Sequence, residues 1–218
     1  MVQFVSVEVG LRKQTLVLLG SLVAAGMANG PAASKPIQTT KYVYYPISGE
    51  TPASIYATMV SHGPRVDGVK AYASTNAVSA QSGLMTQGDL CVLKYYKFKI
   101  DFTINLPRLK NESTLKGRTK TEWKKFSRFL KTHEETHRSI WLACGSALEA
   151  QVQRLKIKSC KELDTKTVKL WDQMRASCAK KQDAFDVAEQ KRLPQQSFVR
   201  LVLSQIAHSS KALAVPQN

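Results

Sequence analysis

The sequence predicts an α+β fold in which a small antiparallel sheet packs on a long antiparallel helical hairpin that carries an HExxH motif. Three observations lead to this class. The stretch from Cys91 to Pro107 alternates apolar and polar residues, as a half-buried strand does. Apolar residues then recur at intervals of three and four residues from Trp123 to Leu148, as they do on one face of a helix. A second helical stretch follows after a short turn, and consecutive helices joined in this way pack antiparallel.

Residues 1–28 are expected to be an export signal that is removed from the mature chain. Two basic residues precede the run LVLLGSLVAAGMA, which is too short to span a bilayer comfortably. Gly26 and Ala28 then supply the small residues of a cleavage site. We therefore expect a periplasmic or secreted protein with no transmembrane span after signal cleavage. Residues 29–40 are expected to form a flexible leader.

One domain is expected over residues 41–195. Its first strand would be KYVYYPIS (41–48), which is rich in aromatic and β-branched residues. PASIYATMVSHG (52–63) has apolar residues at helical spacing and predicts a short helix, whereas residues 68–83 alternate loosely and favour a strand with a turn. Residues 196–218 are expected to be a C-terminal tail.

The long strand and the long helix have the clearest patterns. The even positions from Tyr96 to Leu106 are apolar and the odd positions are polar, so one face of the strand should be buried. Pro107 is expected to end the strand. Thr119 and Glu122 have the spacing of a capping box, which would open the long helix.

The four cysteines all follow the predicted export signal. Their number is even and no C-x-x-C pair occurs, so in an oxidising compartment they predict two disulfides and not a zinc–thiolate site. Bridging Cys144 to Cys178 across the helical hairpin would leave Cys160, in the turn, to pair with Cys91 at the head of the long strand. Other pairings remain open from the sequence alone.

Residues 133–137 read HEETH within the apolar stripe of the long helix. His133 and His137 lie one turn apart, so both imidazoles can bind one Zn²⁺ ion, and Glu134 is placed to act on a metal-bound water. Ring nitrogens that are buried without a partner cost about 1–3 kcal/mol each. A metal ion satisfies one nitrogen on each ring, and the alternative is a histidine pair bonded to buried carboxylates or carbonyls.

A catalytic zinc site needs a third protein ligand. No third histidine extends the motif, because Ala143 stands six residues after His137. A bridge between the cysteines of the hairpin would bring Asp186 and Glu189 of the second helix opposite the histidines. We expect Asp186 to be the ligand and Glu189 to be its substitute; the alternative is that each is a solvated helix residue.

The formal net charge of +16 is unusually high, and the basic residues are scattered along the chain. Such a balance favours an anionic partner, for example an anionic surface of the cell envelope. A basic solvated surface with no dedicated partner is the plainer interpretation. No nucleic-acid-binding motif accompanies the charge, so we expect no specific nucleic-acid partner.

Several stretches resemble the DUF922 family of predicted secreted zinc-dependent proteases: VSHGPRVDGVKAYAST, CVLKYYKFKIDFTINLP and HEETH, followed by a cysteine-bearing second helix. The resemblance covers most of the mature chain. It implies that residues 41–195 are a metallopeptidase domain that acts on a peptide or protein substrate.

The end of the second helix departs from the family pattern, in which an aspartate is followed by a threonine and a histidine. In FDVAEQKRL, Asp186 matches the aspartate, but Glu189 and Lys191 stand at the other two positions. This departure argues against a third histidine ligand and in favour of Asp186.

The expected function is therefore that of an exported zinc-dependent metallopeptidase. His133, His137 and Asp186 would bind the Zn²⁺ ion, and Glu134 would be the catalytic base for attack by a zinc-activated water on a peptide bond. The alternative is a non-catalytic exported binding protein of the cell envelope with a basic surface. The zinc content of the purified protein distinguishes the two.

Overall fold

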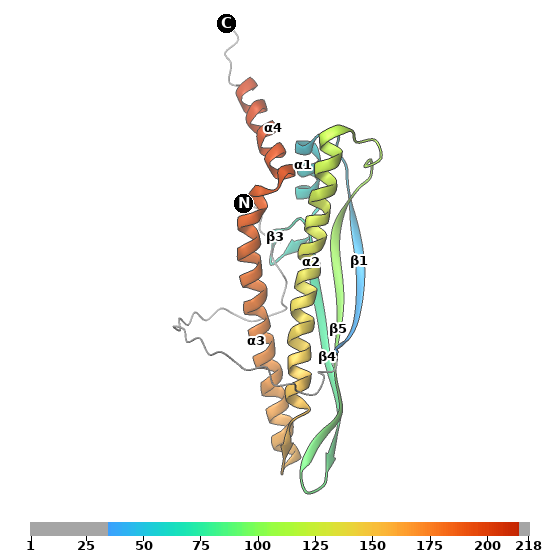
Figure 1. Cartoon of the computed structure of the whole chain (residues 1–218), viewed down its shortest axis with the longest axis vertical. Helices are drawn as coiled ribbons and strands as arrows, with labels where there is room; N and C mark the ends of the chain where they lie inside the picture. Colours follow the sequence, from blue (N-terminus) through green and yellow to red (C-terminus); the bar gives the residue numbers. More distant parts are fainter. Residues whose placement is uncertain (1–34, 214–218) are drawn as a thin grey trace, which may run out of the picture.

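The computed structural model describes residues 35–213, which form an α+β architecture with a four-stranded sheet packed against long helices (Figure 1). The predicted export signal, residues 1–28, lies outside the described residues. No helix within the described range is long and apolar enough to cross a membrane. The described elements are β1 (Ile37–Ile47), α1 (Pro52–His62), β2 (Arg65–Val66), β3 (Val69–Lys70), β4 (Ser74–Gln87), β5 (Cys91–Leu109), α2 (Gly117–Val152), β6 (Lys156–Ile157), α3 (Cys160–Arg192), a 3-10 turn (Leu193–Gln195) and α4 (Ser197–Leu213).

The main sheet is mixed, so the prediction of an antiparallel sheet is wrong at one strand. β5 is central and pairs antiparallel with β4 and with the short β6. On its other edge it pairs parallel with β1, with Ile37 opposite Lys99. Parallel neighbours require a long crossover connection, and the chain between these two strands, which includes α1 and β4, supplies it.

β5 has the predicted alternation, because the even positions from Tyr96 to Leu106 are buried. The expectation that Pro107 ends the strand is wrong, since β5 runs on to Leu109. The β4 ladder stops at the pair formed by Ser74 and Asn105, so Pro107 has only β1 beside it. Proline is tolerated in a strand at such a position, where one of the two neighbouring strands is missing.

Two long helices, α2 and α3, lie side by side, with α2 nearer to the sheet (Figure 1). The apolar stripe predicted for the first of them is buried. The predicted disulfides both form, one between Cys144 of α2 and Cys178 of α3, and the other between Cys91 and Cys160. Gly145 permits the close approach of α2 to β5, because a Cβ atom there would lie 2.3 Å from the Phe98 ring.

The predicted capping box does not form. α2 begins at Gly117, whose φ of +54° suits glycine, and no side chain caps this helix. Thr119 therefore lies inside the first turn. The Glu122 carboxylate accepts hydrogen bonds from Lys125 and from Ser197 at the start of α4.

Both ends of the expected domain are longer than predicted. β1 starts at Ile37, inside the segment expected to be a flexible leader, because its first residues pair with β5. Residues 197–213 form α4 where a tail was expected. Phe198 and Val202 of α4 are buried in the core, and Gln205 accepts a hydrogen bond of 2.9 Å from the N–H of Ala53.

The core consists of two apolar clusters, which contact α2 at different positions along its length. One contains the N-terminal part of α2 as far as Leu130, together with parts of α1, β5 and α4. The other contains Trp141 and the C-terminal part of α2, with β5 and α3. The two buried histidines of α2 lie in the interval between Leu130 and Trp141, so the candidate site interrupts the apolar core.

Candidate metal centre

The two histidines of the motif are buried on the side of α2 that faces α3. His133 is 2% exposed and His137 is 1% exposed. Asp186 of α3 is also buried and lies directly opposite them. One helical turn of α2 and one residue of α3 therefore supply three potential ligands inside the protein.

The donor atoms of these three residues converge. His133 Nε2 lies 3.0 Å from His137 Nε2. The Asp186 Oδ1 atom lies 3.3 Å from the first of these nitrogens and 3.0 Å from the second. The three atoms thus form a nearly equilateral triangle.

This triangle has the size that a small divalent ion requires. Ligands at about 2.0–2.2 Å from a tetrahedral Zn²⁺ ion lie about 3.3 Å from one another. Two imidazole nitrogens and one carboxylate oxygen are also a donor set found in catalytic zinc sites, which have three protein ligands and a fourth position for water. The buried group of His133, His137 and Asp186 can therefore hold a metal ion.

The electrostatics of the group suit a positive charge. Burial acts to lower the pKa of His137, but the hydrogen bond with Asp186 and the charge of Glu134 outweigh it, so the pKa is raised. Burial acts to raise the pKa of Asp186, but its hydrogen bonds with His133 and His137 lower it overall. The carboxylate is thus ionised and neutralises a positive charge on this triangle, whether a proton or a metal ion carries it.

Glu134 is buried beside the triangle and is held by the sheet. Its Oε2 atom accepts a hydrogen bond of 2.8 Å from the hydroxyl of Thr75 on β4. Burial raises the pKa of Glu134, and the histidine charges and the Thr75 hydrogen bond only partly oppose this effect. A carboxyl group with a raised pKa beside a candidate metal site is suited to accept and return a proton.

Gln182 of α3 fixes the orientation of His137. Its Oε1 atom lies 2.5 Å from His137 Nδ1, and its Nε2 atom donates a hydrogen bond of 3.1 Å to the His137 carbonyl. Because the amide oxygen accepts from the Nδ1–H group, the lone pair of His137 is left on Nε2, which faces the triangle. Such outer contacts orient metal-binding imidazoles and raise their basicity.

Two further residues of α3 enclose His133. The Phe185 ring stacks on the imidazole, with 4.8 Å between ring centroids. Glu189 lies on the opposite side of the ring from the triangle, with its Oε2 atom 3.9 Å from Nδ1, and forms an ion pair with Arg192. Of the two carboxylates expected near the histidines, Asp186 is the one that faces both.

Gln182, Thr75 and Phe185 were not identified from the sequence. Gln182 precedes Asp186 by one helical turn, so the same hairpin alignment that selected Asp186 could have found it. Nothing in the sequence signals Thr75, because its role depends on where β4 crosses α2.

These features define a class of protein: an α+β chain whose two long helices carry a buried His-His-Asp group able to hold a metal ion. Within this class the chain belongs to the DUF922 family. The family model, described as "Bacterial protein of unknown function (DUF922)", matches residues 42–192. No curated protein and no solved structure matches the chain.

Replacing Gln182 with Met is expected to lower the zinc affinity about 10- to 100-fold, because the His137 ring loses the contact that orients it. The measurement is competition with a chromogenic chelator. Gln195→Met is the matched control, since Gln195 is exposed and its side-chain amide donates a hydrogen bond to the Lys191 carbonyl, far from the histidines in the sequence. Equal zinc affinities of the Gln182→Met variant and the wild type would exclude the orienting role.

Proposed function

We propose that this protein is an exported zinc-dependent metallopeptidase. The observation that carries the proposal is the convergence of His133 Nε2, His137 Nε2 and Asp186 Oδ1, with the Glu134 carboxyl buried beside them. The predicted export signal and the two disulfides support a periplasmic or secreted location, since disulfides persist in oxidising compartments.

His133, His137 and Asp186 would hold the ion. When bound, zinc supplies Lewis acidity, which lowers the pKa of a coordinated water to about 7 and polarises a carbonyl group. Glu134 accepts a proton as the water oxygen bonds to the peptide carbon, and then donates this proton to the leaving amine nitrogen as the C–N bond breaks. Thr75 holds the Glu134 carboxyl in place through both of these steps.

The test begins with the metal content of the protein recovered after export with its own leader. We expect about one zinc ion per chain, the stoichiometry of a single three-ligand site. The same sample is then incubated with a peptide library and the products are analysed by mass spectrometry. Cleavage should stop when a chelator removes the metal and resume when zinc is restored.

Failure to bind zinc after dialysis against it would overturn the proposal. It would leave the alternative, a non-catalytic binding protein of the envelope with a basic surface. Stoichiometric zinc without any cleavage of the library would reject the peptidase activity while retaining the metal site.

A further inference from the structure

One end of the molecule exposes a group of large apolar side chains. It is formed by the tip of the β4–β5 hairpin, residues 84–95, which makes the lower end of the molecule in Figure 1. The exposed apolar residues of this hairpin tip are Leu84 (59% exposed), Met85 (39%), Leu90 (40%) and Tyr95 (79%). Single exposed apolar residues are common, but several gathered on one protruding hairpin indicate an interaction site.

Basic side chains surround this apolar group. Residues 154–161, which comprise most of the connection between α2 and α3 and the first two residues of α3, lie next to the hairpin and are here called the basic loop. The exposed basic residues of the two segments, together with Lys97 just beyond the hairpin tip, are Lys94, Lys97, Arg154, Lys156, Lys158 and Lys161. The exposed acidic residues in and next to these segments are Asp89, Glu162 and Asp164, so positive charge is in excess.

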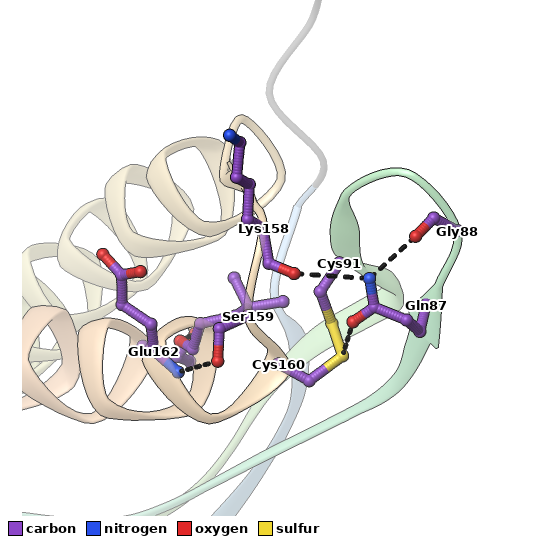
Figure 2. The surroundings of a disulfide bond; sticks show 9 residues. Gln87, Gly88, Cys91, Lys158, Ser159, Cys160 and Glu162 are labelled. Atoms are coloured by element: carbon purple, nitrogen blue, oxygen red, sulfur yellow. Dashed lines mark hydrogen bonds between the residues drawn. A yellow bond between two sulfur atoms is a disulfide. The ribbon is translucent and has the colours of Figure 1, made fainter.

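The basic loop is fixed to the hairpin, so the apolar and basic groups are presented together. The disulfide between Cys91 and Cys160 joins them (Figure 2). Lys156–Ile157, which form β6, pair with the first residues of β5. Gln87 also donates a hydrogen bond of 3.3 Å to the Lys158 carbonyl.

The apolar side chains do not form a flat patch on one face. Leu84 and Met85 are consecutive in β4, and successive side chains of a strand point to opposite faces. A protein partner with a flat surface would cover only one of them. A layer into which the narrow tip inserts covers both, and the lipid headgroup region is such a layer.

We propose that the hairpin tip and the basic loop dock this protein on a bilayer that contains anionic phospholipids. The apolar side chains of the tip enter the headgroup region, and the lysines around them contact lipid phosphates. The strength of membrane attachment of this kind depends on both the buried apolar area and the electrostatic attraction to anionic lipids. The proposal is independent of the metal centre, because it uses no residue of that site.

The test measures co-sedimentation of the exported full chain with vesicles. We expect binding to vesicles of phosphatidylcholine mixed with phosphatidylglycerol, weakening as salt is added, and little binding to phosphatidylcholine alone. The double variant Lys156→Gln/Lys158→Gln should lower the partition coefficient about 25-fold, since each basic side chain near an anionic surface contributes a factor of about five. Leu84→Ser/Leu90→Ser should lower it at least about tenfold through lost apolar burial.

Matched controls alter the opposite end of the molecule. Lys116→Gln/Lys124→Gln changes two exposed lysines near the start of α2, and Leu203→Ser/Ile206→Ser changes two exposed apolar residues of α4. Both control variants should bind vesicles as the wild type does. All of the altered side chains are exposed, so circular dichroism should show unchanged folding in every variant.

Several results would overturn the proposal. The proposal fails if the protein binds neutral and anionic vesicles equally well. It also fails if the variants of the hairpin tip and the basic loop bind vesicles as strongly as the wild type does. Loss of binding in the α4 variant alone would place the contact at the other end. If Leu84→Ser/Leu90→Ser instead dissolves a dimer seen by sedimentation and no vesicle binding occurs, the tip is an interface between copies of the chain.

Discussion

Glu134→Gln is expected to abolish peptide hydrolysis while about one zinc ion per chain stays bound. The amide has the size of the carboxyl group and can still accept the hydrogen bond from Thr75, so the local structure is retained. It cannot accept a proton, and loss of a general base typically lowers the rate about 10²- to 10⁴-fold. The measurements are the rate of peptide cleavage and the metal content of the same preparation.

Glu135→Gln is the matched control for this change. Glu135 is the next residue of α2, but its carboxylate contacts Tyr42 and Arg138 and does not face the histidines. Its replacement should leave both cleavage and zinc content unchanged. Wild-type cleavage by Glu134→Gln would exclude Glu134 as the base, and loss of zinc from that variant would show that the carboxylate is itself a ligand.

His137→Ala is expected to remove zinc from the protein. His137 supplies one of three converging donor atoms and is also the residue that Gln182 orients. Changes to the outer contacts of a metal site lower affinity about 10- to 100-fold, and removal of a ligand should exceed this loss. The metal content after dialysis against a weak chelator measures the effect, and cleavage should disappear with the metal.

His62→Ala provides the comparison for this second change. His62 lies at the exposed end of α1, where its ring contacts Ser61 and the Thr58 carbonyl. This variant should retain the zinc content of the wild type. If His137→Ala does not fold, His137→Gln preserves more of the side-chain volume and keeps the test decisive. Full zinc occupancy in either His137 variant would show that the ion binds elsewhere.

Patterns within single elements could be predicted from the sequence because their causes are local. Apolar residues alternate with polar residues in β5 because one face of the strand is buried and the other is exposed to solvent. The line of apolar residues on α2 arises because one side of the helix is buried. The disulfide between Cys144 and Cys178 was the pairing that we favoured among those the sequence leaves open, and it forms. The same alignment selected Asp186, which is within reach of both histidines.

Features that depend on distant parts of the chain could not be predicted. The sequence of β1 predicts a strand, but no pattern within it indicates that its neighbour is β5 or that the two strands are parallel. Residues 197–213 were expected to belong to a tail, and no local pattern indicates that Phe198 packs beside Trp123. Thr75 is an ordinary strand residue by sequence and acquires its role only where β4 meets α2.

The parallel pairing of β1 has a consequence for how the chain folds. The β4–β5 hairpin closes over a short loop, with Gln87 opposite Cys91, so it can form as soon as both strands exist. The register of β1 instead joins Ile37 to Lys99, and such non-local pairings form slowly because a long loop must close first. We therefore expect β1 to join the sheet after the β4–β5 hairpin has formed, although β1 is synthesised before it. Until β1 joins, one edge of β5 is exposed to pairing with another incompletely folded chain.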